Sequence, residues 1–185
     1  MTNNLIIDAT RQWIETVVVK YNFCPFARKE LETDGLDYVI CENPRLDSVL
    51  DVFEHKCAQM LSPDSPATSL VIVPQGFDDF ERYLDLVDLA QTHTLNVRFD
   101  GILQLASFHP DYCFGGCEVD DAANYTNRSP YPMLHILKEQ NVTAALEEYD
   151  DPESIPDKNI ALARRKGLAT FKQLLQACTS ASTKD

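Results

Sequence analysis

Leu70-Val71-Ile72-Val73 is the stretch of sequence that decides the predicted fold. It is a continuous apolar run, without the alternation of polar and apolar residues that marks a half-exposed strand. Such a run is expected of a strand that is buried on both faces of its sheet. A loop rich in proline and serine precedes it (62–69), and helical spacing follows it from about Asp78 to Thr92. The run therefore predicts an inner strand covered by helices.

Working outward, the chain alternates between strand-like and helix-like segments. Tyr38 to Cys41 and Ile102 to Phe108 read as two further strands, although Asp100-Gly101 could instead be a hairpin turn that pairs residues 97–99 with the second of them. Helical patterns occupy, in order, Leu5 to Lys20, a short segment after Pro25, a segment opened by Asn43-Pro44, Ser129-Pro130 to about Glu139, a short segment capped by Asn141, and Asp157 to about Cys178.

This alternation predicts an α/β fold. We expect a single domain over residues 1–178, with a small, mainly parallel sheet of about three to four strands covered by helices. A long ordered loop is expected after the last strand, followed by a helical C-terminal part, and residues 179–185 are expected to be a disordered tail.

Composition narrows the classes of partner. The formal net charge is −13, which argues against nucleic acid and anionic membranes, because both require a cationic face. No stretch is long and apolar enough to span a membrane, and the N-terminus lacks the pattern of a signal peptide. We therefore expect a soluble, acidic, cytoplasmic protein whose six cysteines are mostly reduced. The oligomeric state is left open.

The 22-residue run from His109 to Pro130 has neither strand nor helix periodicity. Loops longer than about 12–15 residues are uncommon in compact domains unless they are functional or disordered. This one contains three aromatic residues and a cluster of histidine, cysteine, asparagine, arginine and serine, so we interpret it as a folded loop that builds a site. It leaves the carboxyl end of a strand, where ligands of open α/β sheets bind.

Three segments resemble the signature blocks of the uncharacterised domain-of-unknown-function family 1415. They are Asn22-Phe-Cys-Pro-Phe-Ala27, the segment from Ala106 to Tyr112, and the segment from Asn124 to Glu139. The last block is the longest and the most specific, and together the three span most of the chain. The resemblance implies membership of the family and nothing about activity, so the site must be argued from the residues.

Cys24 is the sharpest candidate for chemistry. It lies at or near the predicted start of a short helix, where free N–H groups and the helix dipole favour a thiolate, and Arg28 follows one turn later. The alternative is a buried, structural thiol, because phenylalanines flank it in the sequence and free cysteine is often buried.

Two histidines are also candidates. His109 ends a strand, where it could act as a general acid or base with Asp111 as an orienting group, or could simply anchor the loop. His135 falls among apolar residues near the middle of a predicted helix, where it is either a core residue or a contact to substrate.

Asn127-Arg128-Ser129 precedes the same predicted helix and combines three means of binding an anion. Ser129 could cap the helix, the first-turn N–H groups would be free, and Arg128 offers a planar fork to a carboxylate or phosphate. Arg128 could equally pair with Asp120 or Asp121 and hold the loop in place.

No metal ligands are assigned, and the question of a cofactor is left open. His109, Cys113, Cys117 and His135 could supply ligands to a metal, but their spacing is not a standard zinc pattern. The chain also lacks the glycine-rich motifs of nucleotide-binding loops.

Two functions remain open. The first is an enzyme that acts on a small anionic metabolite, with Cys24 as the nucleophile, His109 as its proton-transfer partner, and Arg128 with Ser129 as the anion clamp. The second is a non-catalytic module that binds a small ligand or a protein, with Cys24 in the core and the 109–130 loop as the binding platform.

Overall fold

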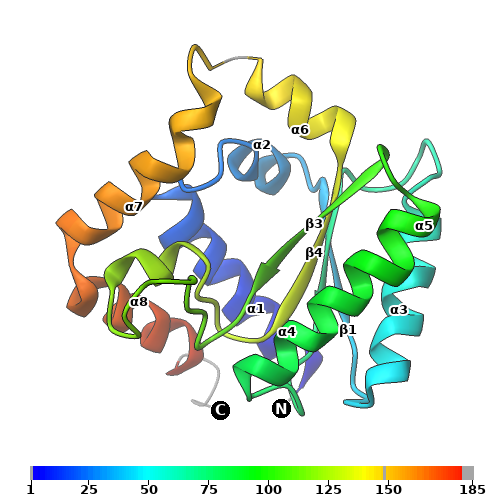
Figure 1. The fold of residues 1–185 in the computed structure, drawn as a ribbon, viewed down its shortest axis with the longest axis horizontal. Helices are drawn as coiled ribbons and strands as arrows, with labels where there is room; N and C mark the ends of the chain where they lie inside the picture. The colour runs from blue at the N-terminus through cyan, green and yellow to red at the C-terminus, as the bar shows by residue number, and fades with distance from the viewer. Residues whose placement is uncertain (1, 148, 181–185) are drawn as a thin grey trace.

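A four-stranded sheet forms the centre of the fold, which a computed structural model describes for residues 2–147 and 149–180 (Figure 1). The strand order is β1-β2-β4-β3. β1 (Leu36–Ile40) runs parallel to β2 (Thr68–Ile72), whereas β4 (Met133–Lys138) is antiparallel to both β2 and β3 (Leu103–Phe108). The predicted α/β class is confirmed. The prediction of a mainly parallel sheet is wrong, because the sheet is mixed.

β4 is the source of that error, because its residues were predicted to form a helix from Ser129-Pro130 to about Glu139. Tyr131 precedes Pro132, and a residue before proline is biased toward extended backbone. The apolar run that follows is buried on both sides of a central strand, and such a run has the same appearance as a buried helix. Val73 donates a hydrogen bond to the carbonyl of Pro132, which extends the pairing with β2 beyond the strand itself.

Helices cover both faces of the sheet (Figure 1). α3 (Leu46–Gln59), α4 (Phe80–Leu89) and the π-helix η2 (Ala90–Leu95) pack on one face, which we call the packed face. Its centre contains Val71, Leu134 and Ile136, none of which has exposed surface. The alternative hairpin through Asp100-Gly101 does not occur, because residues 96–98 form the short helix α5 (Asn96–Arg98).

The opposite face, which we call the cavity face, is covered by N- and C-terminal helices. The predicted first helix is α1 (Asn3–Trp13) continued by the π-helix η1 (Ile14–Val19), and the short α2 (Ala27–Glu32) follows. α7 (Ile155–Lys166) and α8 (Leu168–Ser180) complete this layer.

The single long helix predicted from Asp157 to Cys178 is divided in two by Gly167. This glycine adopts a φ of +84°, a conformation that other residues rarely adopt, and it ends α7 before α8 begins. Thr179 and Ser180 belong to α8, and the rest of the predicted tail lies outside the described residues. α6 (Glu139–Leu146) and the 3-10 turn η4 (Pro152–Ser154) connect β4 to α7.

The loop from 109 to 130 is ordered by its own hydrogen bonds and contains a 3-10 turn, η3 (Ala122–Thr126). Asn124 is fully buried and ties the loop together, since its side chain accepts from the N–H of Phe114 at 3.0 Å and donates to the carbonyl of Glu118 at 2.9 Å. None of the helices in the described ranges is long and apolar enough to cross a membrane.

Candidate functional site

A mostly apolar cavity of about 390 Å³, here called the main cavity, lies on the cavity face of the sheet. Its floor comes from all four strands, with Leu36, Leu70, Ala106 and Leu137 among the contributing residues. α1, η1, α2 and α7 supply the rest of the wall. Because Leu36 and Thr68 are the first residues of β1 and β2, the cavity lies toward the amino ends of these strands. Phe114, Thr126 and Asn127 from the 109–130 loop also reach it.

His135 projects into the main cavity from the central strand β4. Its Nε2 lies 2.6 Å from the hydroxyl of Thr68, and that hydroxyl donates its proton to the carbonyl of Ile136 at 2.7 Å. Since a hydroxyl has one proton to donate, Nε2 of the ring must be the donor to Thr68. The neutral ring then has an unprotonated Nδ1, which has no hydrogen-bond partner among the described residues.

Burial keeps this imidazole neutral. Desolvation lowers the pKa of His135 to about 4. The cavity therefore presents a hydrogen-bond acceptor, Nδ1, rather than a cation at neutral pH.

Cys24 lines the same cavity from the turn that leads into α2. The helix begins at Ala27 with Phe26 at its N-cap, so Cys24 lies before the position predicted for it. The pKa of the thiol is raised, chiefly because burial disfavours the thiolate. The N–H groups of Phe26 and Ala27 act on the sulfur in the opposite sense, without overcoming that effect.

Glu30 is a feature of the wall that was not among the candidates predicted from the sequence. Its side chain is only 6% exposed and lines the main cavity from α2. Within the described residues its carboxylate has neither an ion pair nor a hydrogen bond. Burial raises the pKa of Glu30, while the charge of neighbouring Lys29 lowers it to a smaller extent. The available signal was helical spacing, since Glu30 lies one turn after Phe26 and shares its face.

The amides on the wall are held in place by the protein itself. Asn127 donates to the carbonyl of Ser107 at 3.1 Å and accepts from Thr126 at 3.1 Å. Asn159 donates to the carbonyl of Phe23 at 2.7 Å. Trp13 also lines the cavity, and its indole N–H is buried without an acceptor in the described part of the chain.

His109 does not face the main cavity. It is fully buried at the carboxyl end of β3, against the rings of Phe80 and Tyr83. Both ring nitrogens are engaged: Nε2 lies 2.8 Å from the carbonyl of Phe77, and Nδ1 accepts from the N–H of Asp111 at 3.0 Å. Burial lowers its pKa, so the ring is a neutral anchor of the loop in this structure.

A second cavity of about 450 Å³ lies between the 109–130 loop and α8. Arg128, Ser129 and Asp111 line it, together with Lys172. Arg128 is 9% exposed and donates to the carbonyls of Tyr112 at 3.0 Å and Val119 at 2.8 Å.

Arg128 and Ser129 in the second cavity form hydrogen bonds with backbone carbonyls but no ion pair among the described residues. Arg128 has no acidic partner within 4.0 Å among the described residues, and the ion pair that ties down the loop is instead Arg164 with Asp121. Ser129 does not cap a helix, because β4 follows it, and its hydroxyl donates to the carbonyl of Tyr131 at 2.6 Å.

The candidate residues therefore form three groups. Cys24, Asn127 and His135 share the main cavity, Asp111, Arg128 and Ser129 share the second cavity, and His109 lines neither. No group of three or more His, Cys, Asp or Glu side chains within the described ranges is arranged to hold a metal ion. Of the four residues considered for a metal, Cys113 and Cys117 are in contact, with the thiol of Cys113 at 3.5 Å from the carbonyl of Cys117.

Comparisons with known proteins agree with the resemblance noted in the sequence. The model of a family described as "Protein of unknown function (DUF1415)" matches residues 5–173 of the 185-residue chain. No curated protein and no solved structure matches it. The family description assigns no reaction and no ligand.

Proposed function

The chain belongs to the DUF1415 family of proteins of unknown function, and we propose that it binds a small, largely apolar molecule in the main cavity. The observation that carries the proposal is a cavity of about 390 Å³ with a mostly apolar wall and a few fixed polar groups. Binding sites for small molecules are typically clefts of about 300–1,000 Å³ with this composition.

His135 is the polar anchor of the proposed site. Its Nε2 is committed to Thr68, so Nδ1 is the nitrogen available to accept a hydrogen bond from a ligand. The position is rigid because β4 is the strand between β2 and β3. A ligand with a donor group placed against an apolar body would match both the wall and its acceptor.

The thiol of Cys24 favours the binding alternative over catalysis. A nucleophilic cysteine reacts as its thiolate, whereas burial raises the pKa of this thiol. The pairing of Cys24 with His109 and Arg128 in one active site receives no support, because the three residues do not line a common cavity. We assign Cys24 to ligand contact.

Occupancy of the cavity can be tested with phenylbutanol, a neutral molecule with an apolar body. Trp13 is the only tryptophan of the chain and lines the cavity, so its fluorescence should change as the probe binds. Ala106→Phe places a ring where a small side chain forms part of the floor and should abolish the titration. Ala161→Phe makes the same change at an exposed position on α7 and should leave the titration intact. Equal titrations by both variants would refute the proposed site.

The second cavity supports a second candidate function, the binding of a small anion. Arg128 is buried without an acidic partner in the described residues, and Lys172 lines the same cavity. Asp111 and Asp120 line it too, and these acidic residues oppose an anion. Inorganic phosphate, followed by calorimetry, is the probe. We expect Lys172→Gln to weaken its binding several-fold, and an unchanged affinity would remove this candidate.

A further inference from the structure

We propose that the ligand of the main cavity carries a positively charged nitrogen with N–H groups, as in a primary or secondary amine, and that the carboxylate of Glu30 recognises it. This inference rests on the proposed function and adds the chemical class of the ligand. It starts from an unpaired acidic side chain in a site whose wall is otherwise mostly apolar.

The side chain of Glu30 is mostly buried, and the protein gives its carboxylate no partner among the described residues. The side chain is 6% exposed and lines the cavity, and none of the ion pairs or hydrogen bonds within the described residues involves its carboxylate. Burying a charge is costly unless it is paired and hydrogen-bonded. The neighbouring cation on α2, Lys29, is exposed and does not come within ion-pair distance. A positively charged group on the occupant of the cavity would supply the partner that the protein itself does not give Glu30.

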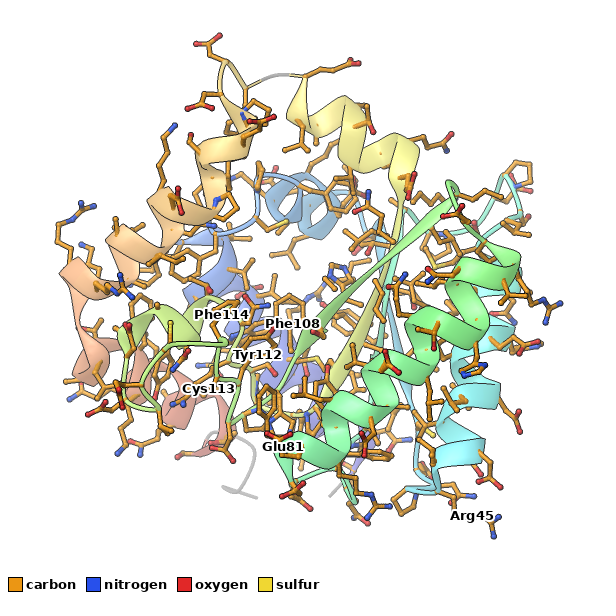
Figure 2. All side chains as sticks on the ribbon, viewed as in Figure 1. Arg45, Glu81, Phe108, Tyr112, Cys113 and Phe114 are labelled. Atoms are coloured by element: carbon orange, nitrogen blue, oxygen red, sulfur yellow. The ribbon has the colours of Figure 1, made fainter. Side chains whose placement is uncertain are left out.

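The aromatic wall of the main cavity suits the same class of ligand. The aromatic side chains come from separate parts of the chain: they are Trp13, Phe23, Phe26, Phe108 and Phe114. Figure 2 shows Phe108 on β3 and Phe114 on the 109–130 loop projecting toward the same region. Aromatic faces attract cations as well as apolar groups, and the attraction is stronger where water is excluded.

The other charges and hydrogen-bond acceptors of the cavity wall also favour a cationic ligand. Within the described residues that line the cavity there is no lysine or arginine to repel a cation or to pair with Glu30. Three polar groups on the wall lack a partner among the described residues: the indole N–H of Trp13 is a donor, whereas the Glu30 carboxylate and Nδ1 of His135 are hydrogen-bond acceptors. An ammonium group supplies donors to such acceptors. The net charge of −13 also favours the approach of a cation.

The test is a series of three probes that share one apolar body and differ in charge: phenylbutylamine, phenylbutanol and phenylbutyrate. Binding is followed by the fluorescence of Trp13 and by calorimetry. We expect wild-type protein to bind the amine about tenfold or more tightly than the alcohol, and the carboxylate most weakly of all. Glu30→Gln should reduce the affinity for the amine to that for the alcohol and leave the alcohol unaffected.

Glu32→Gln is the matched control. It makes the same substitution on the same helix at an exposed residue whose nearest cation, Arg28, is 4.0 Å away. It removes one negative charge from the whole protein without changing the cavity wall, so the preference for the amine should persist. Loss of that preference in both variants would indicate attraction by net charge and would overturn the assignment to Glu30.

Melting temperatures provide a second measurement. Removal of an unpaired buried charge should give Glu30→Gln a melting temperature at or above that of wild type in the absence of ligand. A clear decrease would indicate a structural role for Glu30 and would overturn the inference. Should the variant fail to fold, that outcome would also count against it.

The wild-type comparison separates the two proposals. If the alcohol binds in the cavity and the amine binds no more tightly, the amine inference is overturned and the proposed function stands. If none of the three probes alters Trp13 fluorescence or releases heat on titration, both are overturned.

Discussion

The two faces of the sheet are built from the same strands but packed in different ways. On the packed face, the side chains of Val71, Leu134 and Ile136 meet α3 and α4 and have no exposed surface. On the cavity face, Leu70 and Leu137 instead form part of the floor of a cavity of about 390 Å³. Protein interiors are normally close-packed, so side chains on the cavity face make fewer contacts with other side chains than those on the packed face.

Polar chemistry is concentrated on the less well packed face. His135 and Leu134 are neighbours in sequence, yet one points to the cavity and the other into a solid core, because successive residues of a strand face opposite sides. The packed face supplies stability, and the cavity face carries the groups that can recognise a ligand. The strand β4 contributes side chains to both faces.

The largest effect is expected from Phe→Ala substitutions, one on each face of the sheet. The pair tests whether the packed face contributes more to stability than the cavity face. Phe53 on α3 is completely buried in the packed face, so Phe53→Ala should lower the free energy of unfolding by about 3–5 kcal/mol. Phe108 on β3 lines the cavity and is only half-buried, so Phe108→Ala should cost less than half as much. Urea denaturation of the two variants and wild type would measure both values. Equal losses would contradict the difference in packing.

The second largest expected effect is a pH dependence of the free energy of unfolding, which arises from His135 on the cavity face. Burial lowers the pKa of His135 from 6.5 to about 4, so between these values the unfolded chain binds a proton that the folded protein does not. Stability should therefore fall as the pH decreases through this window, by about 2–3 kcal/mol between about pH 7 and about pH 4.5.

His135→Gln is the variant that isolates this contribution. Glu30 acts in the opposite sense, since its pKa is raised and its contribution to stability is lost as the pH increases. Both proteins contain Glu30, so the difference between their urea midpoints across the pH range reports His135 alone. Parallel pH profiles would show that the imidazole is not desolvated as described.

The strands and helices were predictable to the extent that their patterns are local. Strands β1 to β3 and the amphipathic helices α3 and α4 fall where apolar spacing and proline indicate. β4 is covered on both faces and so has no alternation, and the bias of Tyr131 toward extended backbone before Pro132 is the only local sign of a strand there. Gly167 could have been recognised as a break in the last predicted helix.

The candidate site was predictable only in part. Cys24 and His135 were selected for their chemistry, and they do share the main cavity. Glu30 and Thr68 were missed because their importance depends on what surrounds them: one has no partner, and the other fixes the tautomer of His135. The shape of a cavity depends on many side chains that are distant in sequence, and no local pattern encodes it.

The smallest expected effect is a difference in alkylation rate between two cysteines, one on each face of the sheet. Cys57 on α3 has no exposed surface and burial raises its pKa to about 12, whereas Cys24 borders the main cavity. We expect iodoacetamide to label Cys24 slowly near neutral pH and faster as the pH rises, because its pKa is also raised. Cys57 should remain unlabelled until the protein unfolds.

Mass spectrometry of labelled peptides, with Cys24→Ser as the control, would follow both thiols separately. Phenylbutanol should slow the labelling of Cys24 without affecting Cys57, because only Cys24 shares a cavity with the probe. The substitution itself should cost about 1 kcal/mol, as expected for a modest change in a partly buried side chain. Rapid labelling of Cys24 below pH 7 would mean that its sulfur is a thiolate in the folded protein. The N–H groups of Phe26 and Ala27 would then outweigh desolvation, and the catalytic hypothesis would regain its nucleophile.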